Sequence, residues 1–144
     1  MACFLDVWTS QKMALTMNYT ELEVWTEARK LTTVIYRLTT VFPSEERFGL
    51  VSQMRRSTIS ILSNIAEGCG RRTNKDTLHF LHMARGSLYE LEAQCFVALD
   101  LGFMGNEGFN SARAQILLIK RLLSGFIKYF RNFQSADRGP NPKP

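Results

Sequence analysis

The chain has 144 residues, of which 45% are hydrophobic and 22% charged, and this is enough for one domain with its own core. Its three cysteines are widely spaced and form no CxxC pair, which excludes a disulfide framework and the usual zinc sites and favours a reducing compartment. The net charge of +5 permits a polyanionic partner but does not require one.

Two helices are predicted in the first half of the chain, where apolar residues recur every three or four positions. The first covers residues 24–42 and stops at Pro43, which cannot continue a helix. The second covers residues 51–65 and stops at Gly68-Cys69-Gly70, whose glycine pair is suited to a helix C-terminus. Phe48, which precedes the second helix, is predicted to lie in the core.

A third helix is predicted with an apolar stripe over residues 81–98. Thr73 is placed at its N-cap, with Asp76 in the position of a capping box, and the helix is expected to end near Gly102. Gly86, in the middle of this helix, costs about 1 kcal/mol relative to alanine. We therefore expect another helix to approach Gly86 closely.

A fourth helix is predicted over residues 109–133, and it is apolar over more than one face. A bundle core needs only about three apolar positions in seven, so the surplus indicates a second buried surface. We expect the chain to self-associate through this surface, the alternative being an irregular bundle that buries the surplus itself. The surplus residues are Leu117, Leu118, Leu122 and Ile127.

The predicted fold class is all-α, an antiparallel up-down-up-down four-helix bundle over residues 19–134, because short connections force consecutive helices to run antiparallel. Residues 1–18 are expected to form a flexible N-terminal extension, and residues 135–144 a disordered proline-rich tail. No apolar run reaches the roughly 18 to 20 residues that span a membrane, and no signal peptide is recognisable. We therefore expect a cytoplasmic protein that has no membrane partner.

Neither a metal site nor an active site is predicted. Asp76, His79 and His82 recur every three residues, as in a carboxylate-x-x-His ligand pair, but a di-iron bundle needs that motif twice together with further inward carboxylates. We interpret these three residues as solvated surface groups. The sequence contains no nucleophile motif and no nucleotide-binding loop, so we expect neither enzymatic activity nor a cofactor.

The two cysteines inside the predicted bundle are interpreted differently. Cys95 lies on the apolar stripe of the third helix and is expected to be inert. Cys69, between two glycines, is expected to be more exposed and open to oxidation, with Arg71 and Arg72 able to lower its pKa.

A structural polar role is predicted for Asn64, which lies at the edge of the core stripe of the second helix. A buried amide must find hydrogen-bond partners, so we expect Asn64 to bond a neighbouring helix or loop, with Glu67 among the candidate partners. The functional alternative is that Asn64 and Glu67 line a ligand pocket.

Basic residues are the strongest functional candidates, because the planar guanidinium of arginine is suited to phosphate. Arg55 and Arg56 point about 100° apart on a helix, so we expect one to face a partner and the other to pair with Glu45 or Glu46. A solvated basic surface is an equally weighted alternative, since aromatic residues that would stack on bases are not interleaved with these arginines. The candidates are Arg55, Arg56, Arg71, Arg72, Lys75, Arg113, Lys120, Arg121 and Lys128.

A series of ordered motifs covers about residues 19–103. They are Leu22-Glu23-Val24-Trp25, Phe42-Pro43, Glu45-Glu46-Arg47-Phe48-Gly49-Leu50, Ser52-Gln53, Arg55-Arg56, Asn64-Ile65-Ala66-Glu67-Gly68 and Ala84-Arg85-Gly86-Ser87-Leu88. These motifs closely resemble the bacterial four-helix bundle proteins that are encoded in intervening sequences of 23S ribosomal RNA genes. The family usually has proline at the position of Leu62, so the second helix is expected to be straighter here.

The resemblance implies a bundle that assembles into a ring-like homopentamer. It also implies a distant relationship to the accessory proteins of diversity-generating retroelements, which bind nucleic acid and a reverse transcriptase. The resemblance implies no enzymatic activity.

We interpret the protein as a non-enzymatic homo-oligomeric scaffold that binds nucleic acid, RNA in the first place, through Lys and Arg contacts to phosphates. The expected partners are further copies of the chain and ribosomal or other structured RNA. The alternative is a protein-protein assembly adaptor that has no direct role with nucleic acid.

Overall fold

Four long helices form the body of the protein in the computed structural model, which describes residues 17–136. They are α2 (Glu23–Thr39), α3 (Leu50–Cys69), α4 (Asn74–Asp100) and α5 (Asn106–Ala136), with two short 3-10 turns, η1 (Tyr19–Glu21) and η2 (Ser44–Glu46). The described part of the chain contains no strand, so the predicted all-α class with four helices is confirmed. The predictions for residues 1–18 and 135–144 lie almost entirely outside the described residues.

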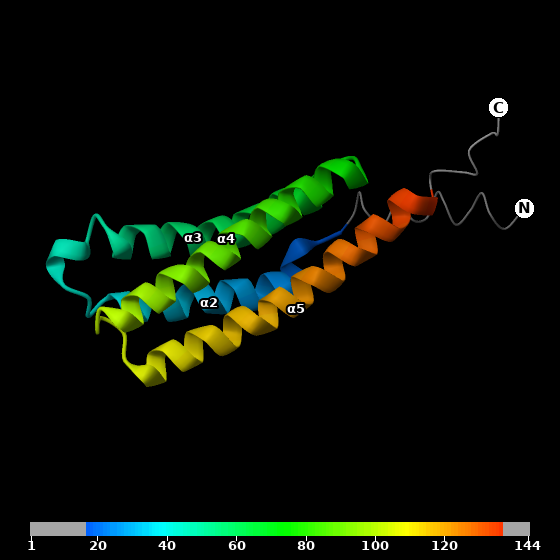
Figure 1. Cartoon of the computed structure of the whole chain (residues 1–144). Helices are drawn as coiled ribbons and strands as arrows, with labels where there is room; N and C mark the ends of the chain where they lie inside the picture. Colours follow the sequence, from blue (N-terminus) through cyan, green and yellow to red (C-terminus); the bar gives the residue numbers. More distant parts are fainter. Residues whose placement is uncertain (1–16, 137–144) are drawn as a thin grey trace, which may run out of the picture.

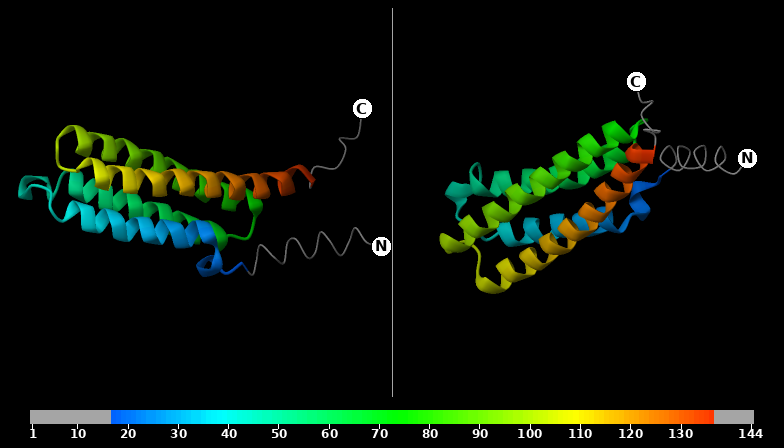
Figure 2. Two further views of the ribbon diagram at one scale, coloured as in Figure 1. Left: turned by 90° about the horizontal axis from the view of Figure 1, so that it is seen from below. Right: turned by 45° about the vertical axis from the view of Figure 1, so that its right-hand side comes forward.

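The helices lie side by side in an elongated body, as the views in Figure 1 and Figure 2 agree. Helix α3 packs on α2 and α4, and α5 packs on α4 and α2, so the four helices surround a common core. None of the helices in residues 17–136 is both long enough and apolar enough to cross a membrane.

The core is built from the apolar stripes that the three- and four-residue spacing predicts. Leu31 and Ile35 of α2 are fully buried, as are the matching residues of the other three helices. These are Met54, Ile61 and Ile65 of α3, Leu81, Leu88 and Leu91 of α4, and Ile116, Ile119 and Leu123 of α5.

Hydroxyl groups join α3 to its neighbours on both sides. The Oγ1 atoms of Thr32 on α2 and Thr58 on α3 lie 2.9 Å apart, and Thr58 is fully buried. On the other side, the Oγ atoms of Ser60 on α3 and Ser87 on α4 are also 2.9 Å apart. These short contacts satisfy hydroxyls that would otherwise lose their hydrogen bonds on burial.

The ends of α4 follow the sequence closely. Thr73 is the N-cap, and its Oγ1 accepts a hydrogen bond of 3.1 Å from the backbone N–H of Asp76. After Asp100 the chain leaves the helix through Gly102, whose φ of +72° is the left-handed conformation that glycine adopts without strain. Helix α2 ends at Thr39, a few residues before Pro43.

The prediction that the second helix stops at Gly68-Cys69-Gly70 is confirmed, since Gly70 is the C-cap residue of α3. Helix α3 continues to Cys69, and Gly68 is buried against the start of α4. A Cβ atom at Gly68 would lie 3.2 Å from both the Phe80 Cβ and the Thr77 carbonyl oxygen. The hydroxyl of Thr77 also donates a hydrogen bond of 2.9 Å to the Gly68 carbonyl. The glycine is therefore required by close packing of two helices.

The close approach expected at Gly86 is absent within the chain. Gly86 is exposed, and no atom lies within 4 Å of the position that its Cβ would occupy. The close contact of α3 with α4 lies instead at Gly68, near the short connection between these two helices.

Phe48 is not a core residue, because 88% of its surface is exposed. The turn η2 carries it away from the bundle, and its ring lies beside the guanidinium of Arg47 at 5.4 Å. The core at this end is closed by Phe42 instead, whose ring packs on Phe103 with centroids 5.8 Å apart.

The surplus apolar residues of α5 divide between core and surface. Ile127 is buried in the core, and Leu122 packs against it. Leu118 is half-buried, whereas Leu117 is 48% exposed. The bundle therefore buries part of the surplus itself, and a second apolar surface on α5 is smaller than the sequence predicts.

Candidate nucleic-acid interface

Two stretches without acidic residues lie on the pair of helices α2 and α3. Residues 28–44 and 47–66 contain six Lys or Arg residues and neither Asp nor Glu. The six are Arg29, Lys30, Arg37, Arg47, Arg55 and Arg56. Among residues 17–136, Lys30 is the only one of them that pairs with a carboxylate, since its Nζ lies 2.7 Å from the Glu27 carboxylate.

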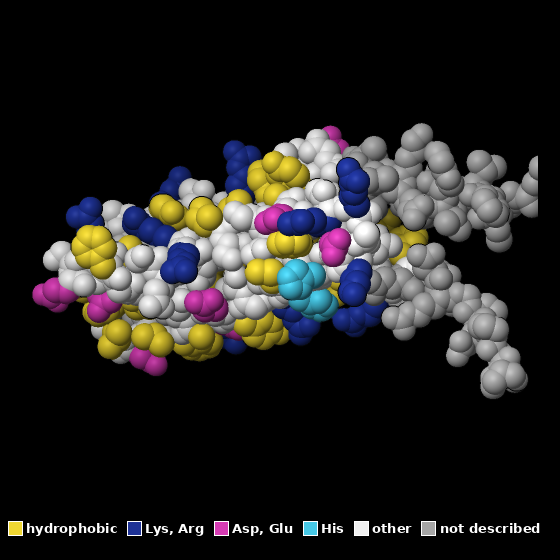
Figure 3. All heavy atoms as spheres, turned by 90° about the horizontal axis from the view of Figure 1, so that it is seen from above, with side chains coloured by type: hydrophobic (Ala, Val, Ile, Leu, Met, Phe, Trp, Pro, Cys, Tyr) yellow, Lys and Arg dark blue, Asp and Glu magenta, His cyan; other side chains and the backbone are white. Residues whose placement is uncertain are grey.

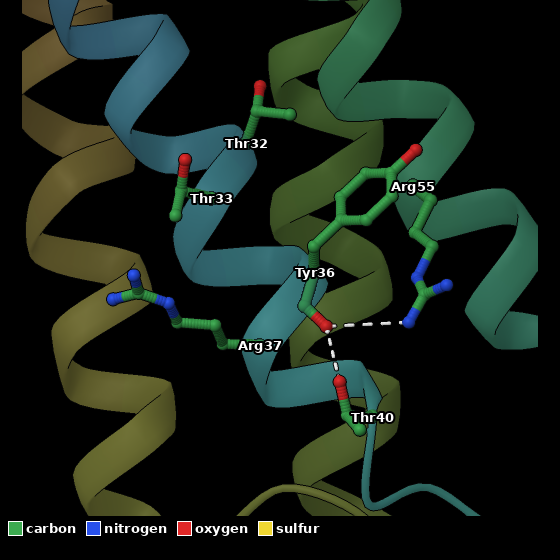
Figure 4. A pocket seen from close by; sticks show the side chains of 6 residues that line it. All are labelled: Thr32, Thr33, Tyr36, Arg37, Thr40 and Arg55. Carbon is green, nitrogen blue, oxygen red and sulfur yellow. Dashed lines mark hydrogen bonds between the residues drawn. The ribbon is translucent and has the colours of Figure 1, made fainter.

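A shallow pocket of about 430 Å³ lies on this pair of helices (Figure 4). Most of its lining comes from α2, because positions three and four apart share one face of a helix. Arg55 reaches the pocket from α3, and in Figure 4 it lies on the opposite side from Arg37. The lining residues are Thr32, Thr33, Tyr36, Arg37, Thr40 and Arg55.

Arg55 is fixed in place by neutral groups. Its Nε donates a hydrogen bond of 3.0 Å to the hydroxyl of Thr39, and its Nη2 donates one of 3.4 Å to the carbonyl oxygen of Tyr36. The guanidinium also lies over the Tyr36 ring, 4.6 Å from its centroid. These partners carry no charge, so they do not offset the positive charge of the half-buried guanidinium. Two of its five N–H groups form these hydrogen bonds, which leaves three as donors for a ligand.

The expected pairing of Arg55 or Arg56 with Glu45 or Glu46 is wrong. The carboxylate of Glu46 accepts a hydrogen bond of 3.0 Å from the backbone N–H of Leu50 and thereby caps the start of α3. Arg56 is exposed and forms no ion pair with any residue from 17 to 136.

A second basic group lies at the connection between α3 and α4. Arg71 pairs with Glu67 at 2.5 Å, and its guanidinium lies 4.3 Å from the centroid of the Phe80 ring. Arg72 and Lys75 are exposed and have no acidic partner in the described part of the chain. Figure 3 shows Lys and Arg side chains around the two histidines at this end of the molecule, with acidic side chains among them.

The basic candidates on α3 and in its connection to α4 therefore fall into two separate groups. Arg55 lies fourteen positions before the end of α3 at Cys69, and this corresponds to a rise of about 21 Å at 1.5 Å per residue. Arg55 and Arg56 belong with Arg37 on α2, whereas Arg71 lies at the other end of α3.

The positive charge of the four basic candidates on α5 is partly neutralised. Lys120 and Arg113 both face Glu92 of α4: the Lys120 Nζ forms a short ion pair with its carboxylate, and the Arg113 Nε lies 3.9 Å from it. These two cations hold α4 and α5 together. Arg121 and Lys128 are exposed and form no ion pair among the described residues.

Aromatic rings are interleaved with the basic residues in space, although they are not in sequence. Arg55 lies over Tyr36 and Arg71 over Phe80, in each case with the ring on a neighbouring helix. Contacts between helices therefore bring rings and basic residues together, which the spacing in the sequence does not indicate. Charge counts over whole helices do not point to the α2–α3 surface either, because the net charge is +1 on α2, +1 on α3 and +4 on α5. The signal in the sequence is the absence of Asp and Glu from residues 28–44 and 47–66.

Asn64 and Glu67 are not partners. The Asn64 Nδ2 donates hydrogen bonds of 2.9 Å to the Ser60 carbonyl and 3.0 Å to the Ser60 hydroxyl, so it reaches α4 only through the contact of Ser60 with Ser87. Glu67 is exposed and pairs with Arg71 instead. Neither residue lines the pocket on α2 and α3.

The residues considered for metal or thiol chemistry are separated from one another. Asp76, His79 and His82 are exposed, and residues 17–136 contain no group of three potential metal ligands. Cys69 is buried, so its expected exposure is wrong, and burial raises its pKa to about 11. Burial raises the pKa of Cys95 to about 12, with a further contribution from the charge of Glu92. Both thiols stay protonated near neutral pH.

These features define a small helical-bundle protein with a basic, arginine- and tyrosine-lined surface on one pair of helices. The chain belongs to the 23S rRNA-intervening sequence protein family, whose sequence pattern matches residues 20–125. The family resemblance recognised in the sequence motifs is thereby confirmed.

A crystal structure with the same fold is that of a protein of unknown function from the S23 ribosomal protein family of Bacteroides thetaiotaomicron. The two structures superpose with a TM-score of 0.68 over 73% of this chain and 95% of the other, at 24% sequence identity. At this identity the similarity is one of fold. No curated protein matches the chain.

Proposed function

We propose that the protein is a non-enzymatic, cytoplasmic scaffold that binds nucleic acid, RNA in preference to DNA, through its basic surface. In this proposal the helices follow the up-down-up-down order and several copies assemble into a ring, as the family resemblance implies. The scaffold then presents its basic surfaces repeatedly around one assembly, which strengthens binding to a long polyanion.

The observation that carries the proposal is the basic surface of α2 and α3, which combines six cations with an absence of acidic residues over residues 28–44 and 47–66. A half-buried guanidinium such as that of Arg55 usually has a carboxylate partner, because an unpaired buried charge is costly. Arg55 is held by Thr39 and Tyr36 and forms no ion pair with any residue from 17 to 136, which supports an anionic ligand. Phosphate fits the fork of donors that guanidinium offers.

The preference for RNA is supported by the name of the family, which refers to intervening sequences of 23S ribosomal RNA. Binding that depends on phosphate contacts must weaken steeply with salt, because each contact releases condensed counterions. A structured fragment of 23S ribosomal RNA is therefore the appropriate first ligand.

The experiment measures fluorescence anisotropy of that labelled fragment over a range of salt concentrations. The test variant replaces Arg37, Arg55 and Arg56 with alanine, and we expect weaker binding at every salt concentration. We also expect a salt slope that is smaller by about 0.7 to 0.9 for each phosphate contact removed. A second variant, with Arg72 and Lys75 replaced, measures the α3–α4 connection, and a third, with Arg121 and Lys128 replaced, measures α5.

The variants divide the outcomes cleanly. A large effect of the first variant with small effects of the other two supports the surface on α2 and α3. Absence of binding at low salt, or binding that none of the three variants alters, refutes the proposal.

A protein-protein assembly adaptor is the second candidate, and the outer face of α4 favours it. Four large apolar side chains there are between 40% and 50% exposed, and Gly86 lies among them. They are Met83, Tyr89, Phe96 and Val97. Copies of the chain or another protein would be able to pack on this face. Recovery of a defined protein without nucleic acid, lost on replacing Val97 with lysine, would favour the adaptor.

A further inference from the structure

Two arginines lie against aromatic rings along one edge of α2. The Arg29 guanidinium is 5.8 Å from the centroid of the Trp25 ring, and that of Arg55 is 4.6 Å from the centroid of the Tyr36 ring. Trp25 and Tyr36 are eleven residues apart, which is close to three helical turns, so they share one face about 16 Å apart. The edge of α2 therefore repeats a pairing of planar ring and cation.

The pocket lies at the second of these pairs. Tyr36 remains 40% exposed although Arg55 lies beside its ring, and Arg37 and Arg55 flank the pocket from opposite sides (Figure 4). The Thr33 and Thr40 hydroxyls donate their protons to backbone carbonyl oxygens of α2. The hydrogen-bond donors that the pocket offers to an anion are therefore the two guanidinium groups and the Tyr36 hydroxyl, and the threonine oxygens offer acceptors.

We propose that this pocket binds an unpaired nucleotide of a single-stranded nucleic acid. Its base stacks on Tyr36, and the phosphates on either side of that nucleotide lie against Arg37 and Arg55. The geometry combines the two elements that single-strand binding uses, an aromatic platform and a cationic track along the backbone. A base inside a duplex is stacked on its neighbours and cannot reach such a platform. The inference rests on the proposed nucleic-acid function and specifies the strand form that this surface takes.

The experiment compares a labelled single-stranded RNA with the duplex formed by the same strand and its complement, using anisotropy at fixed salt. We expect the unaltered protein to bind the single strand more tightly. Replacing Tyr36 with alanine is expected to weaken single-strand binding by about tenfold, which lies within the range measured for loss of one stacked base, and to leave duplex binding unchanged. Tyr36→Phe keeps the ring and is expected to retain the affinity.

Tyr89→Ala is a matched control. Tyr89 is also an exposed tyrosine beside a cation, since the Lys120 Nζ lies 3.8 Å from its ring centroid, but that cation is paired with Glu92. We expect Tyr89→Ala to bind both strands normally. Circular dichroism confirms that each variant is folded, and Arg37→Ala, at an exposed position, supplies an independent loss of single-strand affinity.

Each remaining outcome overturns the inference. Equal binding of single strand and duplex, with both dependent on the α2 and α3 arginines, refutes the nucleotide pocket and leaves the proposed function standing. Equal losses in Tyr36→Ala and Tyr89→Ala refute it as well. Absence of binding to both ligands at low salt refutes the proposed function and this inference together.

Discussion

Replacing Gly68 with alanine tests the close packing of α3 on α4. The added Cβ atom would lie 3.2 Å from the Phe80 Cβ and from the Thr77 carbonyl oxygen, and neither is the free end of a flexible side chain. Overpacking of this kind costs about 1 to 3 kcal/mol, from which the better helix propensity of alanine subtracts about 1. We therefore expect Gly68→Ala to lower the free energy of unfolding by about 0 to 2 kcal/mol.

Gly86→Ala is the matched substitution in an exposed part of a helix. No atom lies within 4 Å of its added Cβ, so only the gain in helix propensity remains. The free energy of unfolding should rise by about 0.5 to 1 kcal/mol.

Urea denaturation followed by circular dichroism at several protein concentrations measures both changes. A rise in the free energy of unfolding of Gly68→Ala as large as that of Gly86→Ala would refute the packing argument at Gly68. A Gly86→Ala variant that is destabilised, with a loss that grows with protein concentration, would place Gly86 in a contact between copies.

Three further measurements test other parts of the structure. Because burial raises the pKa of Cys69 to about 11 from 9.0, the folded state holds that proton more tightly than the unfolded state, so the free energy of unfolding should fall as pH rises from about 9 to 11. A Cys69→Ala variant should lose part of this slope, and an unchanged profile would contradict the burial. Lys120→Ala leaves Glu92 with only its distant contact to Arg113, so the free energy of unfolding measured with urea should fall by about 1 to 2 kcal/mol. An unchanged free energy of unfolding would show that the ion pair does not stabilise the fold. Val97→Lys should lower the molar mass in light scattering if the outer face of α4 joins copies, and an unchanged mass would remove that face from the interface.

The helices can be predicted from the sequence because the apolar residues that are buried recur every three or four positions. Leu31 and Ile35 occupy the stripe expected from three- and four-residue spacing, and both are fully buried. The N-cap at Thr73 is also predictable, because a threonine hydroxyl next to an apolar run is typical of the start of a helix. The prediction that Phe48 lies in the core is wrong, because hydrophobicity alone does not show that a turn directs this side chain outward.

The candidate site was less accessible to sequence reasoning, because its contacts join different helices. Arg55 and Tyr36 are nineteen residues apart, and only the packing of α2 on α3 brings guanidinium and ring together. The surroundings of a glycine are equally hard to predict from sequence. Gly68 and Gly86 have the same helix propensity, but Gly68 is packed against α4 and Gly86 lies in open surroundings. The type of residue was visible in the sequence, whereas its neighbours across the bundle were not.

The hydroxyl contacts on the two sides of α3 fix how α2, α3 and α4 are aligned along their axes. Apolar contacts are nearly indifferent to sliding, because a helix displaced by one turn still presents an apolar stripe. The pairs Thr32 with Thr58 and Ser60 with Ser87 require one particular alignment, since a shift by one turn leaves hydroxyls buried without partners. With Thr58 and Ser60 only two residues apart, a short segment of α3 sets the alignment of three helices at once. A library that randomises the apolar core while keeping these four residues should therefore retain the topology more often than one that varies them.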